Sequence, residues 1–208
     1  MATDAQARTR LARAAVLDAA RALFTERGYA ATTISAIAGR AGVARATVFT
    51  SVAGGKPELL RLARDVALAG DDEPVPVPQR PWFREAMSAP QATELLRLQA
   101  RNYRMIQQRA AALERCLVTA AATVPELAEL LADARRQRAM GTRLVVDRLV
   151  ETGAVPPQRR APAADILYAL ASPDVFLLLT EDRGWTAADY EQWLYHALTD
   201  ALLDPRHP

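Results

Sequence analysis

The sequence has few of the residues on which most enzyme chemistry depends. Among 208 residues it contains one cysteine, Cys116, and two histidines, His196 and His207. A single cysteine excludes an intramolecular disulfide, and the histidines lack the nearby carboxylates or cysteines of a metal site. Only four serines occur, and none lies in the Gly-x-Ser-x-Gly turn of an esterase. We therefore expect no catalytic residues, no metal and no cofactor, and we rank a helical enzyme third among the possible functions.

Aromatic and β-branched residues are also sparse. Phe, Trp and Tyr make up 6% of the chain, whereas Ala and Leu dominate an apolar fraction of 50%. This composition favours helices over sheets and predicts an all-α protein. The longest apolar stretches, such as VFLLL at 175–179, are far too short to span a bilayer, and the N-terminus shows no signal-peptide pattern. We expect a soluble, cytoplasmic protein with no membrane partner.

Charge is distributed unevenly along the chain. The whole sequence has a net charge of only +2, but residues 1–64 carry ten basic and four acidic side chains. The remaining residues carry 16 basic and 20 acidic side chains. A basic N-terminal segment on a mildly acidic body indicates a polyanionic partner, although a run of charge is more often only a solvated surface.

Three helical patterns follow one another near the N-terminus. Apolar residues recur with helical spacing over Val16–Phe24, and Gly28 is placed to end that helix. Thr33 is placed to cap a second, shorter helix. A tight turn at Gly42-Val43 then leads to a third helix over about 44–51. Two short helices joined by a glycine-containing turn indicate a helix-turn-helix unit.

The rest of the chain forms a larger helical module. We predict a helix-turn-helix domain over 8–56 and a second domain over 57–208. The helix 57–70 connects the two, and 71–81 has four prolines, which should prevent helix formation and favour an extended loop. From Gln91 onward the pattern is helical almost throughout.

Three later boundaries have local signals. A long helix should end near Thr152, because Gly153 follows it. Ser172 precedes a proline and is the expected N-cap of the next helix. The TAAD segment at 186–189 approximates a capping box that opens the last helix.

The third helix has the residues that a DNA groove accepts. Val48 and Val52 are one turn apart and should face inward, which leaves on the outer side Arg45, Ala46, Thr47, Phe49 and Thr50. Arginine bonds a guanine edge or a phosphate, and threonine offers a methyl group and a hydroxyl. The same pattern also fits a plain helical hairpin whose threonines are caps.

Further phosphate contacts are expected at the flanks of this unit. Thr33 and Ser35 lie at the start of the second helix, where free backbone N–H groups favour an anion. Lys56, the only lysine in the chain, lies just beyond the third helix.

The run from Ala14 to Ala63 resembles the DNA-binding domain of the TetR family of bacterial transcriptional regulators. The resemblance rests on AARALFTERGYAATTISAIAGRAGVARATVFTSV, followed by Gly-Gly-Lys and ELL. It implies DNA contacts by Thr33, Ser35, Arg45, Thr47, Phe49, Thr50 and Lys56.

The chain departs from the family pattern in three places. Phe49 stands where tyrosine is usual, so it offers an apolar contact but no hydroxyl to a phosphate. Ser51 stands where histidine is common, and the VAGGK segment makes the spacing to the lysine one residue longer.

The resemblance also implies a C-terminal domain that dimerises and binds a small-molecule effector. Apolar stripes near the C-terminus allow a dimer, although they also fit a helix that covers its own core. The expected interface residues are Val175, Phe176, Leu179, Tyr190, Trp193, Leu194, Ala197 and Leu198. The candidate effector-pocket residues, which equally fit a plain core, are Tyr103, Met105, Cys116, Leu117, Met140, Arg143, Leu144 and Tyr168.

The leading hypothesis is a homodimeric repressor that binds a double-stranded DNA operator and is released by a small-molecule effector. The alternative is an all-α small-molecule-binding protein in which DNA binding is minor or lost. Strong salt dependence of binding to DNA would separate the two.

Overall fold

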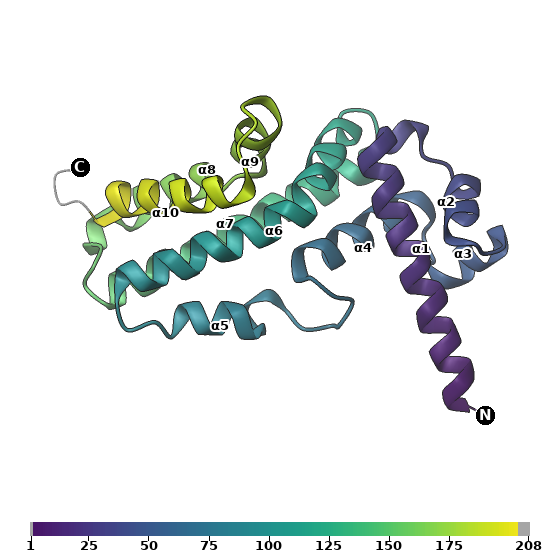
Figure 1. The fold of residues 1–208 in the computed structure, drawn as a ribbon, viewed down its shortest axis with the longest axis horizontal. Coiled ribbons are helices and arrows are strands. Elements are labelled where there is room, and N and C mark those ends of the chain that lie inside the picture. The colour runs from purple at the N-terminus through teal and green to yellow at the C-terminus, as the bar shows by residue number, and fades with distance from the viewer. Residues whose placement is uncertain (1, 204–208) are drawn as a thin grey trace. The chain divides into compact units, whose positions relative to one another are not determined.

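The computed structural model describes residues 2–203, with side chains from Gln6 onward, and it contains no strand within that range (Figure 1). The predicted all-α fold is therefore confirmed. The elements are α1 (Ala2–Ala31), α2 (Ile34–Ala41), α3 (Arg45–Ser51), α4 (Gly55–Ala69), η1 (Val77–Gln79), α5 (Pro81–Met87), α6 (Ala92–Ala121), α7 (Pro125–Glu151), η2 (Pro157–Arg159), α8 (Arg160–Leu170), α9 (Pro173–Leu177), η3 (Leu178–Asp182) and α10 (Ala187–Leu203).

The chain forms two compact units. Unit 1 comprises the chain up to Asp72 together with Ala112–Ala132, and unit 2 comprises Glu73–Ala111 together with the chain from Asp133 onward. Unit 1 therefore includes α1–α4, the end of α6 and the start of α7. The boundaries of these compact units differ from the predicted boundaries of the functional domains, 8–56 and 57–208. The functional division stays a prediction.

The core of unit 1 is built from small and medium-sized side chains on short helices. The stripe predicted for the first helix is buried, from Val16 to Phe24, and it packs with Ile37 of α2 and Val48 of α3. Leu59 and Leu60 of α4 are also fully buried. Each of these helices buries one face, as an amphipathic pattern requires. The prediction that Val48 and Val52 face inward is confirmed.

A kink at Gly28 turns the chain from α1 towards α2. Gly28 has φ 73° and ψ 176°, a backbone conformation open almost only to glycine. The buried Thr32 lies just beyond the kink, and its hydroxyl lies 2.7 Å from the carbonyl oxygen of Gly28 and 3.1 Å from that of Leu23. Thr32 therefore holds the end of α1 in place, and the helix resumes for one short turn after the predicted end.

Unit 2 has a larger core to which α5–α10 all contribute. Its centre includes Leu95, Val146, Leu167 and Leu198, from four different helices, and all are fully buried or nearly so. Aromatic side chains pack at one side of this core. The rings of Phe176 and Tyr190 lie edge to face with centroids 4.9 Å apart.

The local boundary signals are confirmed. Thr33 caps α2 by accepting a hydrogen bond from the Ala36 N–H, and Ser172 caps α9 by accepting one from the Val175 N–H. The backbone N–H of Thr186 donates to Asp189, whose own N–H donates to the Thr186 hydroxyl, which completes a capping box. Helix α7 ends at Glu151, one residue before the predicted end.

The proline-rich segment is less extended than predicted. Residues Val77–Gln79 form a short 3₁₀ turn, and Pro81 is the first residue of α5. Proline is compatible with a first helical turn, because the N–H that it lacks would have no partner there. Arg80 is buried in this segment and donates to the carbonyl oxygens of Glu73 and Val75.

One stretch of the described chain, Pro157–Asp182, has the length and hydropathy of a membrane span, with a mean hydropathy of 1.5. Ser172 caps a new helix in the middle of this stretch, so it is not one uninterrupted helix. Ala163, Leu167 and Phe176 within it are buried in the core of unit 2. Core helices of soluble proteins pass the same test.

Replacing Gly28 by alanine is expected to destabilise unit 1. A Cβ at Gly28 meets no atom within 4 Å, so the cost is backbone strain alone, about 1–3 kcal/mol of unfolding free energy. Gly39→Ala is the matched control, because Gly39 lies within α2 and its Cβ also meets nothing. That change should stabilise the protein by about 0.5 kcal/mol. Urea denaturation followed by circular dichroism measures both, and a loss of stability in the control as large as that in Gly28→Ala would contradict the assignment of strain to Gly28.

Candidate DNA-binding surface

Helices α2 and α3 form a compact helix-turn-helix. Gly42 ends α2 in a left-handed conformation with φ 68°, and the Val43 N–H donates to the Ala38 carbonyl oxygen at 3.1 Å. The inner side of α3 is held in the core of unit 1 by Val48 and by Val52, which directly follows the helix; both side chains are buried. This anchoring directs the opposite side of α3 to solvent.

The outer side of α3 is exposed and carries one charge. Arg45, Ala46, Phe49 and Thr50 are exposed, and their spacing places them on one face of the helix. The Phe49 side chain is 47% exposed. The Arg45 guanidinium lies 6.0 Å from the centre of the Phe49 ring. Thr47 is half-buried beside this face.

The start of α2 offers a second group of polar atoms. Thr33 and Ser35 are both exposed there. The first turn of α2 contains no acidic residue, so the positive end of the helix dipole is not neutralised. Because the Thr33 oxygen accepts from the Ala36 N–H, its hydroxyl proton is available to a phosphate.

Lys56 has a structural contact that the sequence pattern did not reveal. Its Nζ donates to the Tyr29 carbonyl oxygen at 2.9 Å and lies 4.1 Å from the centre of the Tyr29 ring. Tyr29 in turn stacks on Phe24 at 5.8 Å. Lys56 therefore ties the first turn of α4 to the end of α1. An ammonium has three donors, so this contact leaves others for a phosphate.

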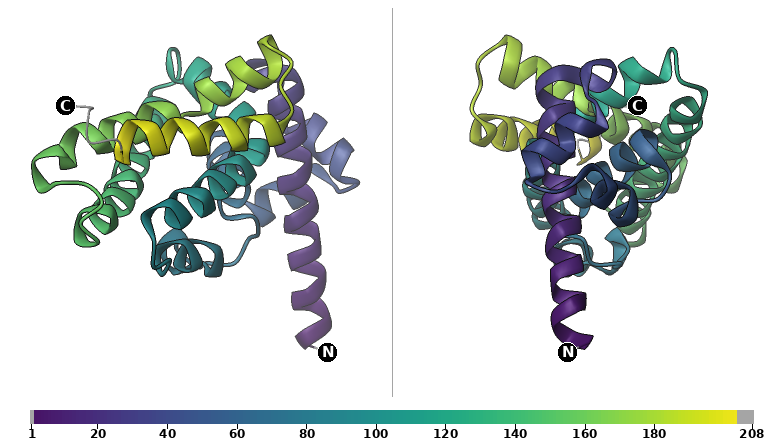
Figure 2. Two further views of the ribbon diagram at one scale, coloured as in Figure 1. Left: turned by 60° about the vertical axis from the view of Figure 1, so that its left-hand side comes forward. Right: turned by 90° about the vertical axis from the view of Figure 1, so that its right-hand side faces the viewer.

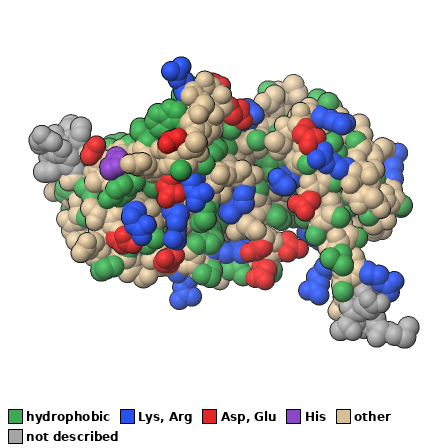
Figure 3. Space-filling view, viewed as in Figure 1, with side chains coloured by type: hydrophobic (Ala, Val, Ile, Leu, Met, Phe, Trp, Pro, Cys, Tyr) green, Lys and Arg blue, Asp and Glu red, His purple; other side chains and the backbone are tan. Residues whose placement is uncertain are grey.

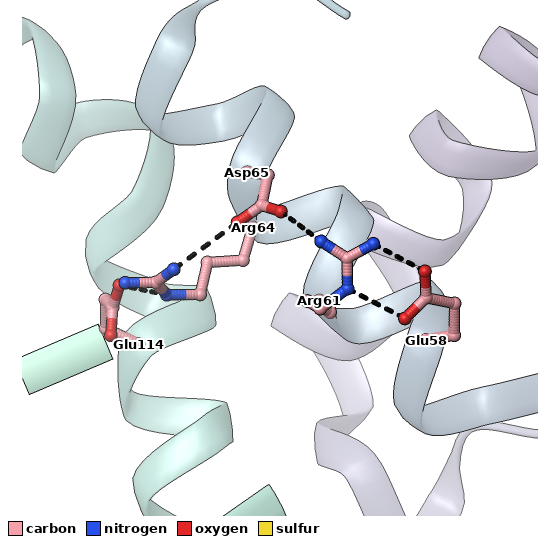
Figure 4. A network of polar contacts seen from close by, with 5 residues as sticks. All are labelled: Glu58, Arg61, Arg64, Asp65 and Glu114. Carbon is pink, nitrogen blue, oxygen red and sulfur yellow. Dashed lines mark hydrogen bonds and ion pairs between the residues drawn. The ribbon is translucent and has the colours of Figure 1, made fainter. Parts of the chain in front are cut away.

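A buried ion pair fixes α4 within unit 1 (Figure 4). Arg64 Nε donates to Glu114 Oε1 at 2.5 Å, and the two side chains are only 5% and 14% exposed. On the other side of α4, Arg61 forms ion pairs with Glu58 at 2.5 Å and with Asp65 at 2.7 Å. Arg64 also lies 3.5 Å from Asp65, which joins both sets into one network.

This network sets the packing of α4 against the end of α6. A buried charge is costly unless it is paired, so Arg64 and Glu114 have to remain together. Burial raises the pKa of Asp65, and the neighbouring Arg64 and Arg61 guanidiniums oppose that rise. Glu58 has its pKa lowered, chiefly by its hydrogen bonds to Arg61.

The sequence reasoning missed this network, although a signal was present. Arg64 follows Leu60 by four residues and Ala63 by one, so it falls on the buried stripe of α4. An arginine on an apolar stripe indicates a buried partner. Nothing in the sequence identified that partner as Glu114, which is 50 residues away.

The eight candidate pocket residues are divided between the two units. Cys116 and Leu117 are buried in unit 1, whereas the other six belong to unit 2. Met140, Arg143 and Leu144 are exposed in the single chain. The remaining three, Tyr103, Met105 and Tyr168, are half-buried.

Cys116 behaves as a small apolar side chain. It is 7% exposed, and its burial raises the pKa of its thiol. Within the described residues, no group of three or more His, Cys, Asp or Glu side chains converges as a metal site would.

The predicted dimer residues divide into two groups. Phe176, Tyr190, Leu194 and Leu198 are buried within the core of unit 2 itself. The half-buried residues of the predicted set are Val175, Leu179, Trp193 and Ala197.

One shallow hollow of about 180 Å³ lies in unit 1, between α1 and the end of α4. Leu17 and Val66 contribute apolar atoms, and Asp18, Asp71 and Asp72 lie around it. Its volume is below the range usual for sites that enclose a small molecule.

The geometry defines a class, an all-α protein with an N-terminal helix-turn-helix whose recognition face is exposed. Residues 16–60 match the family model described as bacterial regulatory proteins, tetR family. The chain thus carries the N-terminal domain of the TetR family, and the resemblance expected from its sequence is confirmed.

Solved structures share the fold over almost the whole chain. The SmeT–triclosan complex is 19% identical with a TM-score of 0.68, covering 94% of this chain and 93% of that one. SmeT is the repressor of the Stenotrophomonas maltophilia multidrug efflux pump SmeDEF. A protein from Saccharomonospora viridis in complex with choline is 22% identical with a TM-score of 0.69, covering 93% and 98%.

A third structure, the fatty acid degradation regulator FadR from Bacillus halodurans, is 16% identical with a TM-score of 0.67, covering 94% and 97%. No curated protein matches the chain by sequence. At these identities the solved structures establish the fold, and the contacts of this chain have to be argued from its own residues.

Replacing Glu114 by alanine is expected to destabilise unit 1 strongly. The change leaves the buried Arg64 without its main partner, which should lower the unfolding free energy by about 3 kcal/mol. Glu94→Ala is the control, because it breaks the exposed pair with Arg97 and should leave stability nearly unchanged. Urea denaturation measures both. The apolar double variant Arg64→Met/Glu114→Leu should recover most of the loss, and a double variant as unstable as Glu114→Ala would show that the ion pair is not the cause.

Proposed function

We propose that this protein is a homodimeric, sequence-specific DNA-binding repressor that a small-molecule effector releases from its operator in the bacterial cytoplasm. The observation that carries the proposal is the exposed outer face of α3, where Arg45, Phe49 and Thr50 face solvent above two buried valines. This exposed face leaves apolar, hydroxyl and guanidinium groups available for contact with a partner.

The chemistry of this face suits the major groove. Arg45 at the start of α3 is long enough to bond a guanine edge with two donors. Phe49 and Ala46 offer apolar contact to a thymine methyl group, and Thr50 offers a hydroxyl. Thr33, Ser35 and Lys56 would contact phosphates on either side, which positions α3 without reading sequence.

Unit 2 contains buried polar atoms that support an effector site. The Tyr190 hydroxyl and the Gln107 Oε1 are buried and have no hydrogen-bond partner among the described residues. Gln107 is held in orientation by its Nε2, which donates to the Ala171 carbonyl oxygen at 2.8 Å. Buried polar groups usually have partners, so these two atoms favour a ligand that supplies them.

Tyr103 adds a second hydroxyl to this group. Although the residue is half-buried overall, desolvation raises the pKa of its phenol. Burial first, and then the proximity of Tyr103, raise the pKa of Tyr190 as well. Both phenols are therefore protonated donors at neutral pH. Together with Gln107 and the rings of Phe176 and Trp193, they suit an aromatic or cationic ligand that carries a hydroxyl or N–H group.

The positively charged side chain of Arg138 interacts electrostatically with Tyr103. The Arg138 guanidinium stacks 3.4 Å from the centre of the Tyr168 ring and donates to the Tyr168 carbonyl oxygen. Tyr168 belongs to the predicted pocket set, whereas Arg138 was not anticipated. Because Arg138 is already stacked and hydrogen-bonded, we assign it to holding α7 against α8 rather than to binding an anionic effector.

Release by the effector requires only that the ligand prefer the conformation that cannot bind DNA. Helix α6 is continuous from Ala92 to Ala121, and it carries Gln107 in unit 2 and Glu114 in unit 1. A ligand contact at Gln107 is therefore seven residues, about two helical turns, from the partner of Arg64. We propose that this helix transmits binding to α4.

A homodimer would form through the exposed apolar side chains of unit 2. Met140 and Leu144 on α7 are 60% and 41% exposed, and Leu178 is 52% exposed. The half-buried members of the predicted interface, such as Trp193, would add to this surface. A two-fold axis would present two α3 helices to half-sites one helical turn, or a multiple, apart.

Binding to operator DNA should depend on Arg45. A duplex selected from a random-sequence pool is the target, and fluorescence anisotropy across a salt series is the measurement. Wild type should bind it far more tightly than a scrambled duplex, with log affinity falling steeply with log salt. Arg45→Ala should cost about 1–3 kcal/mol for each half-site of the selected duplex and little on the scrambled one.

Arg84→Ala, which removes an exposed arginine from unit 2, is the control and should change neither affinity. If the selection yields no duplex and the protein binds no DNA at low salt, the result would contradict the proposed repressor. It would favour the alternative, an all-α small-molecule-binding protein.

Replacing Tyr190 by phenylalanine should have opposite effects on the free protein and on ligand binding. Removing a buried hydroxyl without a partner should raise the unfolding free energy of the free protein by up to about 1 kcal/mol. Triclosan and choline, the molecules in two of the similar structures, both carry a hydroxyl and are the first probes. Whichever of them raises the melting temperature of wild type should raise that of Tyr190→Phe less. An equal rise in both would place the site elsewhere, and Tyr195→Phe, on the same helix, is the control.

A further inference from the structure

The first turns of α1 extend beyond the part of the chain that matches the family. The family model begins at residue 16, whereas α1 begins at Ala2. In Figures 1 and 2 this N-terminal end of α1 projects past the other helices of unit 1 in every view. Its side chains are mostly exposed, including Leu11 at 71%. A projecting helical end contributes little to a core, so packing within unit 1 does not explain why α1 extends this far.

One hydrogen bond directs a face of this projecting end towards the recognition helix. Arg13 Nη1 donates to the carbonyl oxygen of Ser51 at 2.9 Å, and Ser51 is the last residue of α3. Residues three, four and seven positions before Arg13 lie on the same face of α1. These are Arg10, Thr9 and Gln6, and all three are exposed. This face is therefore on the side of α1 where α3 ends.

The charge of this segment is positive. Residues 5–17 contain three arginines and no acidic residue. Two exposed arginines of unit 2, Arg97 and Arg136, form ion pairs with an acid three residues before them, Glu94 and Asp133. Arg10 has no acid within four residues on either side. Figure 3 shows basic side chains on this projecting end. The segment has the charge of a surface that binds a polyanion.

We infer that the α1 face formed by Gln6, Thr9, Arg10 and Arg13 is a second DNA-contacting element, which binds the phosphate backbone beside the groove that α3 enters. The inference rests on the proposed DNA binding and extends it beyond the helix-turn-helix. Arg13 holds the face next to the end of α3, and Arg10 forms the charged contact with a phosphate. Gln6 and Thr9 are neutral hydrogen-bonding side chains on the same face. Such contacts add affinity and fix register, but they read no sequence.

The salt dependence of DNA binding tests this role. Each phosphate contact contributes about 0.9 to the slope of log affinity against log salt. The proposed dimer places two copies of Arg10 on the DNA, so Arg10→Ala should lower that slope by about 2. Between 50 and 200 mM salt, the affinity of this variant should therefore fall by a factor about 12 times smaller than that of wild type. The ratio of affinities for selected and scrambled duplexes should stay the same. Arg10→Lys should keep the wild-type slope, because the charge remains.

Arg8→Ala is the matched control. Arg8 lies on the same projecting end, is exposed and carries the same charge, but it is five residues from Arg13 and therefore on a different face. Its removal should leave the slope close to that of wild type. Circular dichroism of each variant checks that α1 is intact. Hydroxyl-radical footprinting should show that Arg10→Ala loses protection at flanking phosphates and keeps protection at the groove that α3 occupies.

The outcomes separate this inference from the proposed function. If wild type binds the selected duplex and Arg10→Ala has the slope and footprint of Arg8→Ala, the inference is wrong and DNA binding stands. If wild type binds no duplex even at low salt, both the proposed function and the inference fail. A lower slope and a shorter footprint in Arg10→Ala alone support the contact.

Discussion

The recognition helix is too short to be stable alone, and the rest of unit 1 depends on that constraint. Helix α3 has seven residues, well below the length at which an isolated helix forms in water. Its outer face has to remain free for a ligand, so only Val48 and Val52 bury apolar surface. The remaining support comes from outside α3: the turn at Gly42 sets its direction, and Arg13 satisfies a carbonyl group at its end. The first four helices form one compact cluster because α3 requires this support.

The buried Arg64–Glu114 pair has a different role from the apolar contacts around it. Apolar side chains of similar volume would pack at least as favourably, because two buried charges lose their hydration. A charged pair, however, has a single satisfactory arrangement, whereas apolar surfaces tolerate sliding. We interpret the pair as fixing the register of α4 against α6. Lys56, which donates to the Tyr29 carbonyl oxygen, fixes the other end of α4. Both contacts act on the helix that follows the recognition helix.

Local chemistry explains what the sequence could predict. Thr33, Ser172 and the Thr186–Asp189 pair cap helices through atoms a few residues away, so their patterns are sufficient. The helix-turn-helix was predictable because its turn and its two inward valines are also local. The all-α class followed from composition.

Contacts between distant segments explain what the sequence could not predict. An apolar stripe such as that of Tyr190, Leu194 and Leu198 shows that one face of α10 is covered, but it does not show whether the same chain or a second copy covers it. Met140 and Leu144 are apolar at helical spacing, yet both are exposed. Periodicity indicates which residues share a helix face, but it does not show whether that face is buried or what covers it. The same limit concealed Glu114 as the partner of Arg64 and Ser51 as the partner of Arg13.

The small number of base-reading groups on α3 determines how the whole protein has to work. Arg45 is the one charged side chain on that helix, and the other outward residues are Ala46, Phe49 and Thr50. Each correctly read base pair contributes about 1–3 kcal/mol of discrimination, so a single α3 distinguishes few sites in a genome. The phosphate contacts proposed for α1, α2 and α4 would raise affinity for every sequence equally and would not improve this discrimination. Two copies of α3 held at a fixed spacing would improve it, because their discrimination multiplies and the spacing itself becomes a criterion. The sparse chemistry of α3 is therefore the strongest physical argument for a dimer, and it also explains how an effector can control binding by changing only the spacing.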